Sequence, residues 1–556
     1  MNKKVCSFPI LFALLALLIG TCAVVFPASA QAAPTSTGSI TVSGTVASSY
    51  DAYQIFSANV VDGDSDARIA TDLAWASDAA RDAVLPVLHS AGMPNSQTTV
   101  QEAAEWLNAD SHLTSALSAQ LARSLQSSGV VFVALNAGTE AKLPCGYWLI
   151  VADDATIAQG EAGTAPIMAL VGGSAVTVKP KAATPKVAKH VLEDSTDAWQ
   201  KAADATVADD LYWRLSATVP AGLTAYDTYT VRFVDTMSAG LDPSKVAASM
   251  RVYAAAGADG GFDTVQTGKD GRAGTDPAKG WTDITAQCAT KVAADGKTFT
   301  VRTGDLIAAL GGADAFTAGA RVVAVYNAPL NSACNHGIAK GNPNEVYLRY
   351  PRSPFADQSG DAGFTRTPSD DACAYTWDLA LTKRGSDGDK PLAGAVLSIA
   401  DDRGRTLAAD GTWDAEGKAT VTTGEDGRVT VSGVDSGKLE VRELKAPKGY
   451  TAFEGTRSVT VKAEGLDVDQ VAAAKPKLTI TAESPLRADS ADGSTGSLEA
   501  SLINTPTGTP PSITTGGFMP STGDMAMYAA AAAAVAGAAL IVVALLVKRG
   551  GGSHKE

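Results

Sequence analysis

The sequence predicts a mainly β protein, in which tandem immunoglobulin-like sandwiches follow an N-terminal α+β domain. Two observations carry this prediction. From about residue 184 to residue 504, short apolar runs recur at regular spacing with Gly, Asp and Pro turn signals between them, which is typical of β-sandwiches. Helical periodicity is confined to residues before 130, where strand-like segments lie on both sides of it.

The first predicted domain covers residues 31–182. Residues 38–56 alternate broadly between apolar and polar side chains and predict a strand. Thr99 and Glu102 form a capping box that starts a helical region. Leucines then repeat every fourth residue and predict a packed helical stripe: Leu113, Leu117, Leu121 and Leu125. Further strands are expected at residues 130–135, 147–152, 167–171 and 175–178.

Two all-β domains are expected next, at residues 183–372 and 373–506. The strands of the first are expected at residues 211–218, 229–234, 299–302, 321–326 and 346–350. Residues 255–280 are rich in Gly and Asp and predict an extended surface loop. Residues 507–523 are rich in Pro, Thr and Gly and predict a linker that ends in a short motif, considered below.

The N-terminus carries a secretion pattern. Lys3 and Lys4 precede the apolar stretch 5–26, and Ala28-Ser29-Ala30 is a small-residue cleavage site. Residues 1–30 are therefore predicted to be a signal peptide, which places the mature chain in an oxidising exterior.

The C-terminus combines a membrane pattern with an additional motif. The uncharged run 525–547 is long enough to span a hydrocarbon core as a helix, and Lys548 and Arg549 follow it as a cytoplasmic stop. A transmembrane helix and charged tail are thus expected at residues 524–556. The preceding Met519-Pro520-Ser521-Thr522-Gly523 resembles the Leu-Pro-x-Thr-Gly signal that sortase transpeptidases cut between Thr522 and Gly523.

Composition excludes several function classes. The net charge is −14 and the acidic residues are spread through the chain, which argues against a nucleic-acid partner. The histidines are isolated and no CxxC spacing occurs, so neither a metal nor another cofactor is predicted. Of six cysteines, four lie in the mature chain and allow three pairings: Cys145, Cys288, Cys334 and Cys373. We favour Cys288 with Cys334, because both fall in the middle domain.

Segments of the last domain resemble the Cna B-type family. Residues 377–383 and 391–395 are similar to the opening of such a domain, and residues 442–450 match the motif known in that family as the E-box. Residues 502–505 resemble its last strand.

Segments upstream resemble sortase-assembled backbone pilins of Gram-positive bacteria. The similar segments are residues 39–44, 144–150, 185–191, 233–241 and 341–350. Together with the C-terminal motif, the resemblance covers essentially the whole chain. It implies a secreted, cell wall-anchored subunit of a surface pilus, with a structural rather than an enzymatic role.

The resemblance also implies a self-crosslinking chemistry. Sandwich domains of such pilins form intramolecular isopeptide bonds between a Lys amine and an Asn carboxamide, with release of ammonia. The lysine must be buried so that its pKa falls and it becomes a nucleophile. A buried carboxylic acid, kept protonated in the same way, polarises the amide.

In the C-terminal domain, the resemblance assigns this bond to Lys383 and Asn504, with Glu443 as the promoting acid. Lys383 shares the strand parity of the apolar Leu379 and Leu381, which supports an inward side chain.

In the middle domain, the bond is assigned to Lys189 and Asn344, with Asp235 as the acid. Asn342 and Asp209 stay open as alternatives. Between Lys4 and Lys179 the only lysine is Lys142, so the N-terminal domain is expected to lack such a bond.

A further lysine is expected to accept the acyl group of Thr522. Backbone pilins use the lysine of a Tyr-Pro-Lys motif after the first domain, and Lys179-Pro180-Lys181 occupies that place here. Lys181 is the assigned nucleophile and Lys179 the alternative. Proline before Lys181 fixes the local backbone and would help to present the side chain.

The resemblance to sortase-assembled pilins also implies a set of partners. They are a class C sortase, a housekeeping sortase, copies of the same chain, other pilins, peptidoglycan and a host surface ligand. A wall-anchored adhesin or an unpolymerised minor pilin is the alternative, and it would leave Lys181 idle. A secreted enzyme is disfavoured because the sequence shows no catalytic signature.

Overall fold

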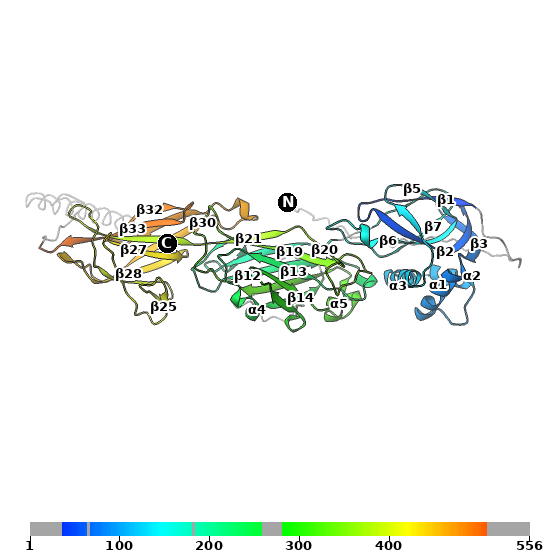
Figure 1. Cartoon of the computed structure of the whole chain (residues 1–556), viewed down its shortest axis with the longest axis horizontal. Helices are drawn as coiled ribbons and strands as arrows, with labels where there is room; N and C mark the ends of the chain where they lie inside the picture. The colour runs from blue at the N-terminus through cyan, green and yellow to red at the C-terminus, as the bar shows by residue number, and fades with distance from the viewer. Residues whose placement is uncertain (1–35, 64–66, 110, 181–183, 258–280, 509–556) are drawn as a thin grey trace, which may run out of the picture.

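The computed structural model describes residues 36–63, 67–109, 111–180, 184–257 and 281–508. In it, three units follow one another along an elongated molecule (Figure 1). The chain is mainly β, as the sequence predicts. The predicted signal peptide, the C-terminal helix and tail, Lys181, Thr522 and Gly523 lie outside the described residues.

The N-terminal unit combines two small sheets with three helices. Its elements are β1 (Thr37–Val42), β2 (Ser49–Asp62), β3 (Arg68–Trp75), α1 (Asp78–Ser90), α2 (Val100–Asn108), α3 (Ser115–Ser127), β4 (Val133–Asn136), β5 (Glu140–Pro144), β6 (Gly146–Ala152), β7 (Ile167–Val171) and β8 (Val176–Val178). One sheet has the order β5-β1-β8; the other has the order β3-β2-β6-β7, with β4 also paired to β2. Buried residues of α1 and α3 pack on those of β2 and β6 in one core.

The helical predictions are largely confirmed, with one correction. The capping box between Thr99 and Glu102 is present, and Leu117, Leu121 and Leu125 are buried on α3. Leu113 is 43% exposed, so its prediction as a core residue is wrong. The reason is local: the Thr114 side chain caps α3 by accepting from the backbone N–H of Leu117, which leaves Leu113 before the first turn.

The middle unit is a sandwich of two sheets. Its strands are β9 (Val187–Glu193), β10 (Ala198–Gln200), β11 (Ala202–Asp204), β12 (Tyr212–Val219), β13 (Arg232–Met237), β14 (Arg251–Ala256), β15 (Thr282–Asp283), β16 (Ala289–Val292), β17 (Thr298–Arg302), β18 (Ala320–Asn327), β19 (Asn342–Pro351), β20 (Phe364–Arg366) and β21 (Asp370–Tyr375). Two short helices, α4 (Val246–Ser249) and α5 (Leu306–Ala309), lie between strands.

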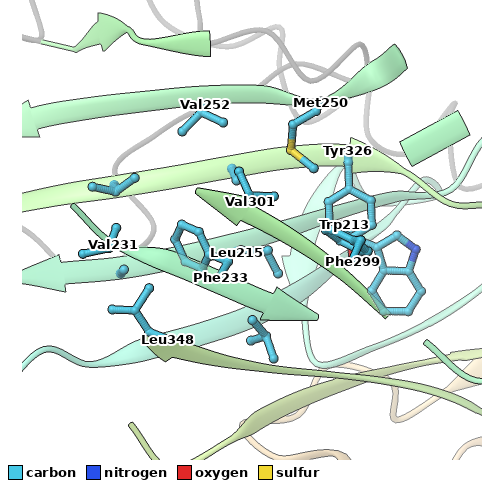
Figure 2. Packing of buried hydrophobic residues seen from close by; sticks show 14 of the residues in the cluster. Trp213, Leu215, Val231, Phe233, Met250, Val252, Phe299, Val301, Tyr326 and Leu348 are labelled. Atoms are coloured by element: carbon cyan, nitrogen blue, oxygen red, sulfur yellow. The ribbon is translucent and has the colours of Figure 1, made fainter. Parts of the chain in front are cut away.

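The two sheets of the middle unit enclose one large core. Their orders are β10-β9-β12-β18-β14-β15 and β11-β21-β19-β13-β17-β16, with β20 on β19. Aromatic residues from both sheets meet inside, and Figure 2 shows Trp213, Phe299 and Tyr326 together at one end of the packed side chains. Strand β21 pairs with β19 as far as Ala374. The middle sheet therefore continues beyond residue 372, where the sequence suggested a boundary.

The C-terminal unit is a second sandwich. Its strands are β22 (Trp377–Gly385), β23 (Val396–Ala400), β24 (Thr406–Leu407), β25 (Trp413–Asp414), β26 (Val421–Thr422), β27 (Arg428–Val434), β28 (Gly437–Lys445), β29 (Tyr450–Thr451), β30 (Thr456–Glu464), β31 (Lys477–Ala482), β32 (Leu486–Asp492) and β33 (Ser497–Pro506). One sheet is β27-β22-β33-β29 with β32 on β33; the other is β25-β24-β23-β28-β30-β31 with β26 on β23. The first and last strands, β22 and β33, are parallel neighbours.

The four cysteines of the described chain are free thiols, so the predicted pairing of Cys288 with Cys334 is wrong. Their side chains face different partners. The Sγ of Cys288 donates to the Ile284 carbonyl at 3.2 Å, while the Sγ of Cys334 lies 3.6 Å from the Nε2 of His336. Among the residues that the structure describes, none of the helices has the length and apolar character needed to cross a membrane.

Candidate functional site

Strand pairing positions the C-terminal candidate site. Leu379, Leu381 and Lys383 alternate along β22 on its buried face. In the parallel pairing of β22 with β33, Lys383 is opposite Leu502 and Gly385 is opposite Asn504. Lys383 and Asn504 are thus diagonal neighbours on one inward face, at the end of the two strands. Both are almost completely buried.

The acid of this site comes from the facing sheet. Glu443 lies on β28, and its side chain is completely buried. The Nζ of Lys383 lies 3.1 Å from Oε1 of Glu443 and also donates to Oδ1 of Asn504. The Nδ2 of Asn504 donates to both carboxyl oxygens of Glu443, at 2.9 and 3.1 Å. The backbone N–H of Phe453 completes the set by donating to Oε2 at 3.0 Å. One carboxyl group therefore touches both reacting nitrogens.

Burial favours the neutral, nucleophilic form of the lysine. Loss of solvent lowers the pKa of Lys383 to about 8, although Glu443 opposes this shift. A larger share of the side chain than for an exposed lysine then carries the free amine near neutral pH, close to an amide carbonyl.

The middle candidate site joins both sheets of its sandwich. Lys189 lies on β9 and faces inward with Val191. Asp235 on β13 and Asn344 on β19 come from the opposite sheet, where Met237 is opposite Asn344 and Asp235 is opposite Val346. The acid and the amide are therefore diagonal neighbours on one face. All three chemical groups are completely buried.

A tyrosine lies at the centre of these groups. The Nζ of Lys189 donates to Oδ2 of Asp235 and to the hydroxyl of Tyr326, the latter at 2.8 Å. The same hydroxyl donates to Oδ2 of Asp235 at 3.0 Å and accepts from Nδ2 of Asn344 at 2.8 Å. Burial lowers the pKa of Lys189 to about 8 against the opposing effect of Asp235, and burial raises the pKa of Asp235.

Tyr326 was not singled out from the sequence, although a signal was present. The strand at residues 321–326 was predicted, and every residue of β18 is buried in the structure, on both of its faces. A buried tyrosine hydroxyl needs a hydrogen-bond partner. A tyrosine in an otherwise apolar strand could therefore have indicated a buried polar contact, although parity could not show which face of the strand it lies on.

The two alternatives for the middle site have other partners. The Nδ2 of Asn342 donates to the carbonyls of Asn335 and Ala374, at 2.9 and 3.2 Å. Asp209 forms ion pairs with Arg403 and Arg405 of the next unit. These contacts stabilise a loop and a joint between units. The amine of Lys189 is hydrogen-bonded to Asp235 and Tyr326.

The remaining lysine predictions are placed as follows. Lys142 is exposed and pairs with Glu140 on the same strand, so it has no buried amide partner. Lys179 is exposed one residue after β8. Lys181, the assigned linking residue, is outside the described residues, as are Thr522 and Gly523.

These features define a class: an α+β unit followed by two β-sandwiches, each of which carries a buried Lys, Asn and acid. Comparison with known proteins adds a family. The family model described as SpaA, a prealbumin-like fold domain, matches residues 378–475. The C-terminal unit therefore contains a SpaA-type prealbumin-like domain, and the match includes Lys383 and Glu443.

A curated relative is the trypsin-resistant surface T6 protein of Streptococcus pyogenes serotype M6. It is 30% identical over 143 residues, which are 24% of this chain and 24% of that protein. The chain thus aligns with about a quarter of the length of this relative.

Solved structures of pilins are also similar to this chain. The T6 backbone pilin of S. pyogenes serotype M6 is 17% identical, with 85% of this chain and 98% of that chain covered and a TM-score of 0.45. The major pilin SpaD of Corynebacterium diphtheriae is 15% identical, with 85% and 98% covered and a TM-score of 0.41.

Proposed function

We propose that this chain is the structural shaft subunit of a covalently polymerised pilus on the surface of a Gram-positive bacterium. Intramolecular isopeptide bonds, Lys383 to Asn504 and Lys189 to Asn344, stabilise its sandwiches. The observation that carries the proposal is the presence of two buried sets of lysine, asparagine and acid within hydrogen-bonding reach. Lysine is almost never fully buried unless it is paired, and here each buried lysine is paired with an acid.

The C-terminal set can form its bond with balanced chemistry. The neutral Nζ of Lys383 attacks Cγ of Asn504, and a new C–N bond forms. Glu443 takes a proton from Nζ and delivers it to Nδ2, since it contacts both nitrogens. The old C–N bond breaks and ammonia leaves. Each chain reacts once per site, so the chemistry is maturation of the subunit rather than turnover.

The bonds would also define how the subunit carries load. In the C-terminal unit, the bond would join the first and last strands, β22 and β33, which already lie side by side. In the middle unit, Asn344 lies on β19, and β20 and β21 follow it. In the middle unit the bond would therefore connect the two facing sheets and would not join a first strand to a last strand.

Polymerisation would join the new C-terminus of one subunit, Thr522, to Lys181 after the first domain of the next subunit. A class C sortase cuts after Thr522 and transfers the acyl group to the amine of Lys181 on the next subunit. A housekeeping sortase joins the base of the fibre to peptidoglycan. The support for this step is the pairing of the Lys-Pro-Lys segment with the C-terminal motif in one sequence.

A substitution pair tests the polymer. With the sortase co-expressed, Lys181→Ala should abolish the high-mass ladder on denaturing gels. Lys179→Ala is the matched control two residues away and should leave the ladder intact. A ladder that survives Lys181→Ala and disappears with Lys179→Ala would reassign the linking lysine. A ladder in neither the variants nor the wild type would favour the unpolymerised adhesin.

A further inference from the structure

The two candidate sites connect their groups differently. In the C-terminal set, the acid itself contacts both reacting nitrogens. In the middle set, that position is taken by the hydroxyl of Tyr326, which lies 2.8 Å from Nζ of Lys189 and 2.8 Å from Nδ2 of Asn344. Within the described chain, this hydroxyl is the hydrogen-bond partner of the asparagine nitrogen. The atom best placed to serve the leaving group is thus a phenol oxygen.

We propose that Tyr326 is a catalytic residue of the middle site, where it relays a proton from Lys189 to the departing nitrogen of Asn344. The inference rests on the proposed function, because it concerns the bond between Lys189 and Asn344. It separates the two sites by mechanism: a carboxyl relay in the C-terminal unit and a phenol relay in the middle unit.

The relay balances in atoms and charge. The neutral Nζ of Lys189 attacks Cγ of Asn344, and the nitrogen that forms the bond becomes acidic. The oxygen of Tyr326 receives a proton from this nitrogen. The hydroxyl proton, which is donated to Oδ2 of Asp235 before the reaction, turns to Nδ2, which leaves as ammonia. The phenol ends the reaction as it began, so no external oxidant, base or ion is consumed.

The surroundings keep Tyr326 in the required state and place. Burial raises the pKa of the phenol well above its ordinary value, so the hydroxyl keeps its proton. The ring lies edge-on to Phe299, with centroids 4.8 Å apart and planes at 75°. Trp213 lies on the adjacent part of the same core (Figure 2). A rigid apolar wall thus fixes the oxygen between the two nitrogens.

Asp235 then has a separate task. Among the described residues, Oδ1 of Asp235 and Oδ1 of Asn344 are both buried without a hydrogen-bond partner. They lie on one face of the β13–β19 pair. Because burial raises the pKa of Asp235, this carboxyl can carry a proton, and a protonated carboxyl polarises an amide carbonyl. Asp235 would act on the carbonyl while Tyr326 acts on the leaving nitrogen.

The test is the mass of the full mature chain during refolding of unreacted protein recovered from inclusion bodies. Wild type should lose two ammonia molecules. Tyr326→Phe should lose one promptly, from the C-terminal site, and the second at least about 100-fold more slowly, since proton transfer of this kind contributes 10²–10⁴-fold. Tyr350→Phe is the matched control: its hydroxyl is also buried but donates to the Gly160 carbonyl, and it should react like wild type.

The outcomes separate this inference from the function on which it depends. Loss of two ammonia molecules from Tyr326→Phe at the wild-type rate would overturn the relay. A wild-type chain that keeps its full mass at Lys189 and Asn344 would instead overturn the proposed middle bond.

Fluorinated tyrosines at position 326 distinguish a relay from a structural role, because a structural role would not make the reaction rate depend on the acidity of the phenol. They keep the ring and hydroxyl but change the acidity of the phenol. A relay predicts that the rate of the second ammonia loss varies with this acidity. A rate independent of it would contradict the proposal, and this measurement decides the matter even where Tyr326→Phe folds poorly.

Discussion

Lys189 and Lys383 are buried lysines, and each is surrounded by the groups that a crosslink needs. Taking an ammonium out of water is costly unless it is paired or loses its proton. In both lysines, burial lowers the pKa to about 8. Each also contacts an aromatic ring face: Lys383 lies 6.0 Å from the centre of Phe453, and Lys189 lies 5.3 Å from that of Tyr326.

Glu443→Gln should block the C-terminal bond. The glutamine side chain cannot carry a proton between the two nitrogens. The variant should therefore be heavier than the wild type by the one ammonia molecule that this site otherwise releases. Lys383 and Asn504 are 121 positions apart, and closing a loop of this length contributes about 5 kcal/mol in the chain-entropy model. The free energy of unfolding of the C-terminal unit should fall by roughly that amount. Glu440→Gln, an exposed acid on the same strand, is the control; the same loss there would contradict the assignment.

The rate of bond formation should rise with pH and level off above about 8. Only the neutral amine attacks, and the pKa of both lysines is about 8; below this value most of the lysine is ammonium. Refolding at a series of pH values, with denaturant quenching and intact-mass detection, measures the rate. A rise centred near the ordinary lysine pKa of about 10.4 would show that these amines are not buried before they react.

At the scale of elements, strand parity explains what could be predicted. The inward positions of Lys383 and Asn504 follow from the alternation of β22 and β33 with their leucines. Parity cannot show which strands face each other across a sandwich, so Tyr326 on β18 was missed. The free thiols of Cys288 and Cys334 show the same limit, because sharing a domain does not bring two side chains together.

The strands after Asn344 should be the extensible part of the middle unit. The two proposed bonds would close the chain from Lys189 to Asn344 and from Lys383 to Asn504, which leaves residues 345–382 in neither loop. Strands β20 and β21 hold this stretch through pairing with β19 and β11. In single-molecule pulling from position 181 to position 508, only this stretch should lengthen.

Asn344→Ala provides the comparison for that experiment. It removes the middle bond and should add the extension of the whole middle sandwich. If wild type already shows that longer extension, the middle bond does not carry load.

At the scale of the whole molecule, polar contacts join the successive units. The Nε1 of Trp377 donates to Asp204 at 2.6 Å, and so does the hydroxyl of Ser436 at 2.6 Å. Arg405 pairs with Asp209 beside them. These contacts tie the middle unit to the C-terminal unit along the long axis of the molecule (Figure 1). The sequence did not indicate these contacts, because each one pairs a residue of the middle domain with a residue of the C-terminal domain.

The middle unit should lose stability as pH rises through about 7. The titrating group is Glu193 on β9, whose carboxylate accepts hydrogen bonds from Ser195 and from the backbone N–H of Asp204 in the same unit. Burial, then the nearby Asp204, raises the pKa of Glu193 to about 7, above its value in the unfolded chain. Glu193 therefore binds more protons when folded, and its contribution to stability is full below the unfolded pKa and lost as pH rises through the folded one. Thermal unfolding of the full chain between pH 5 and 8 measures this. Glu193→Gln should flatten the profile, and an unchanged profile would contradict the assignment to Glu193.

The central claim is that one chain is crosslinked internally and joined head to tail. Peptide mapping by mass spectrometry of fibres purified from the native cell surface tests it most directly. Three branched peptides are expected: Lys383 with Asn504, Lys189 with Asn344, and Lys181 of one subunit with Thr522 of the next. Linear peptides that contain unmodified Lys383, Lys189 and Lys181 throughout the fibres would contradict it.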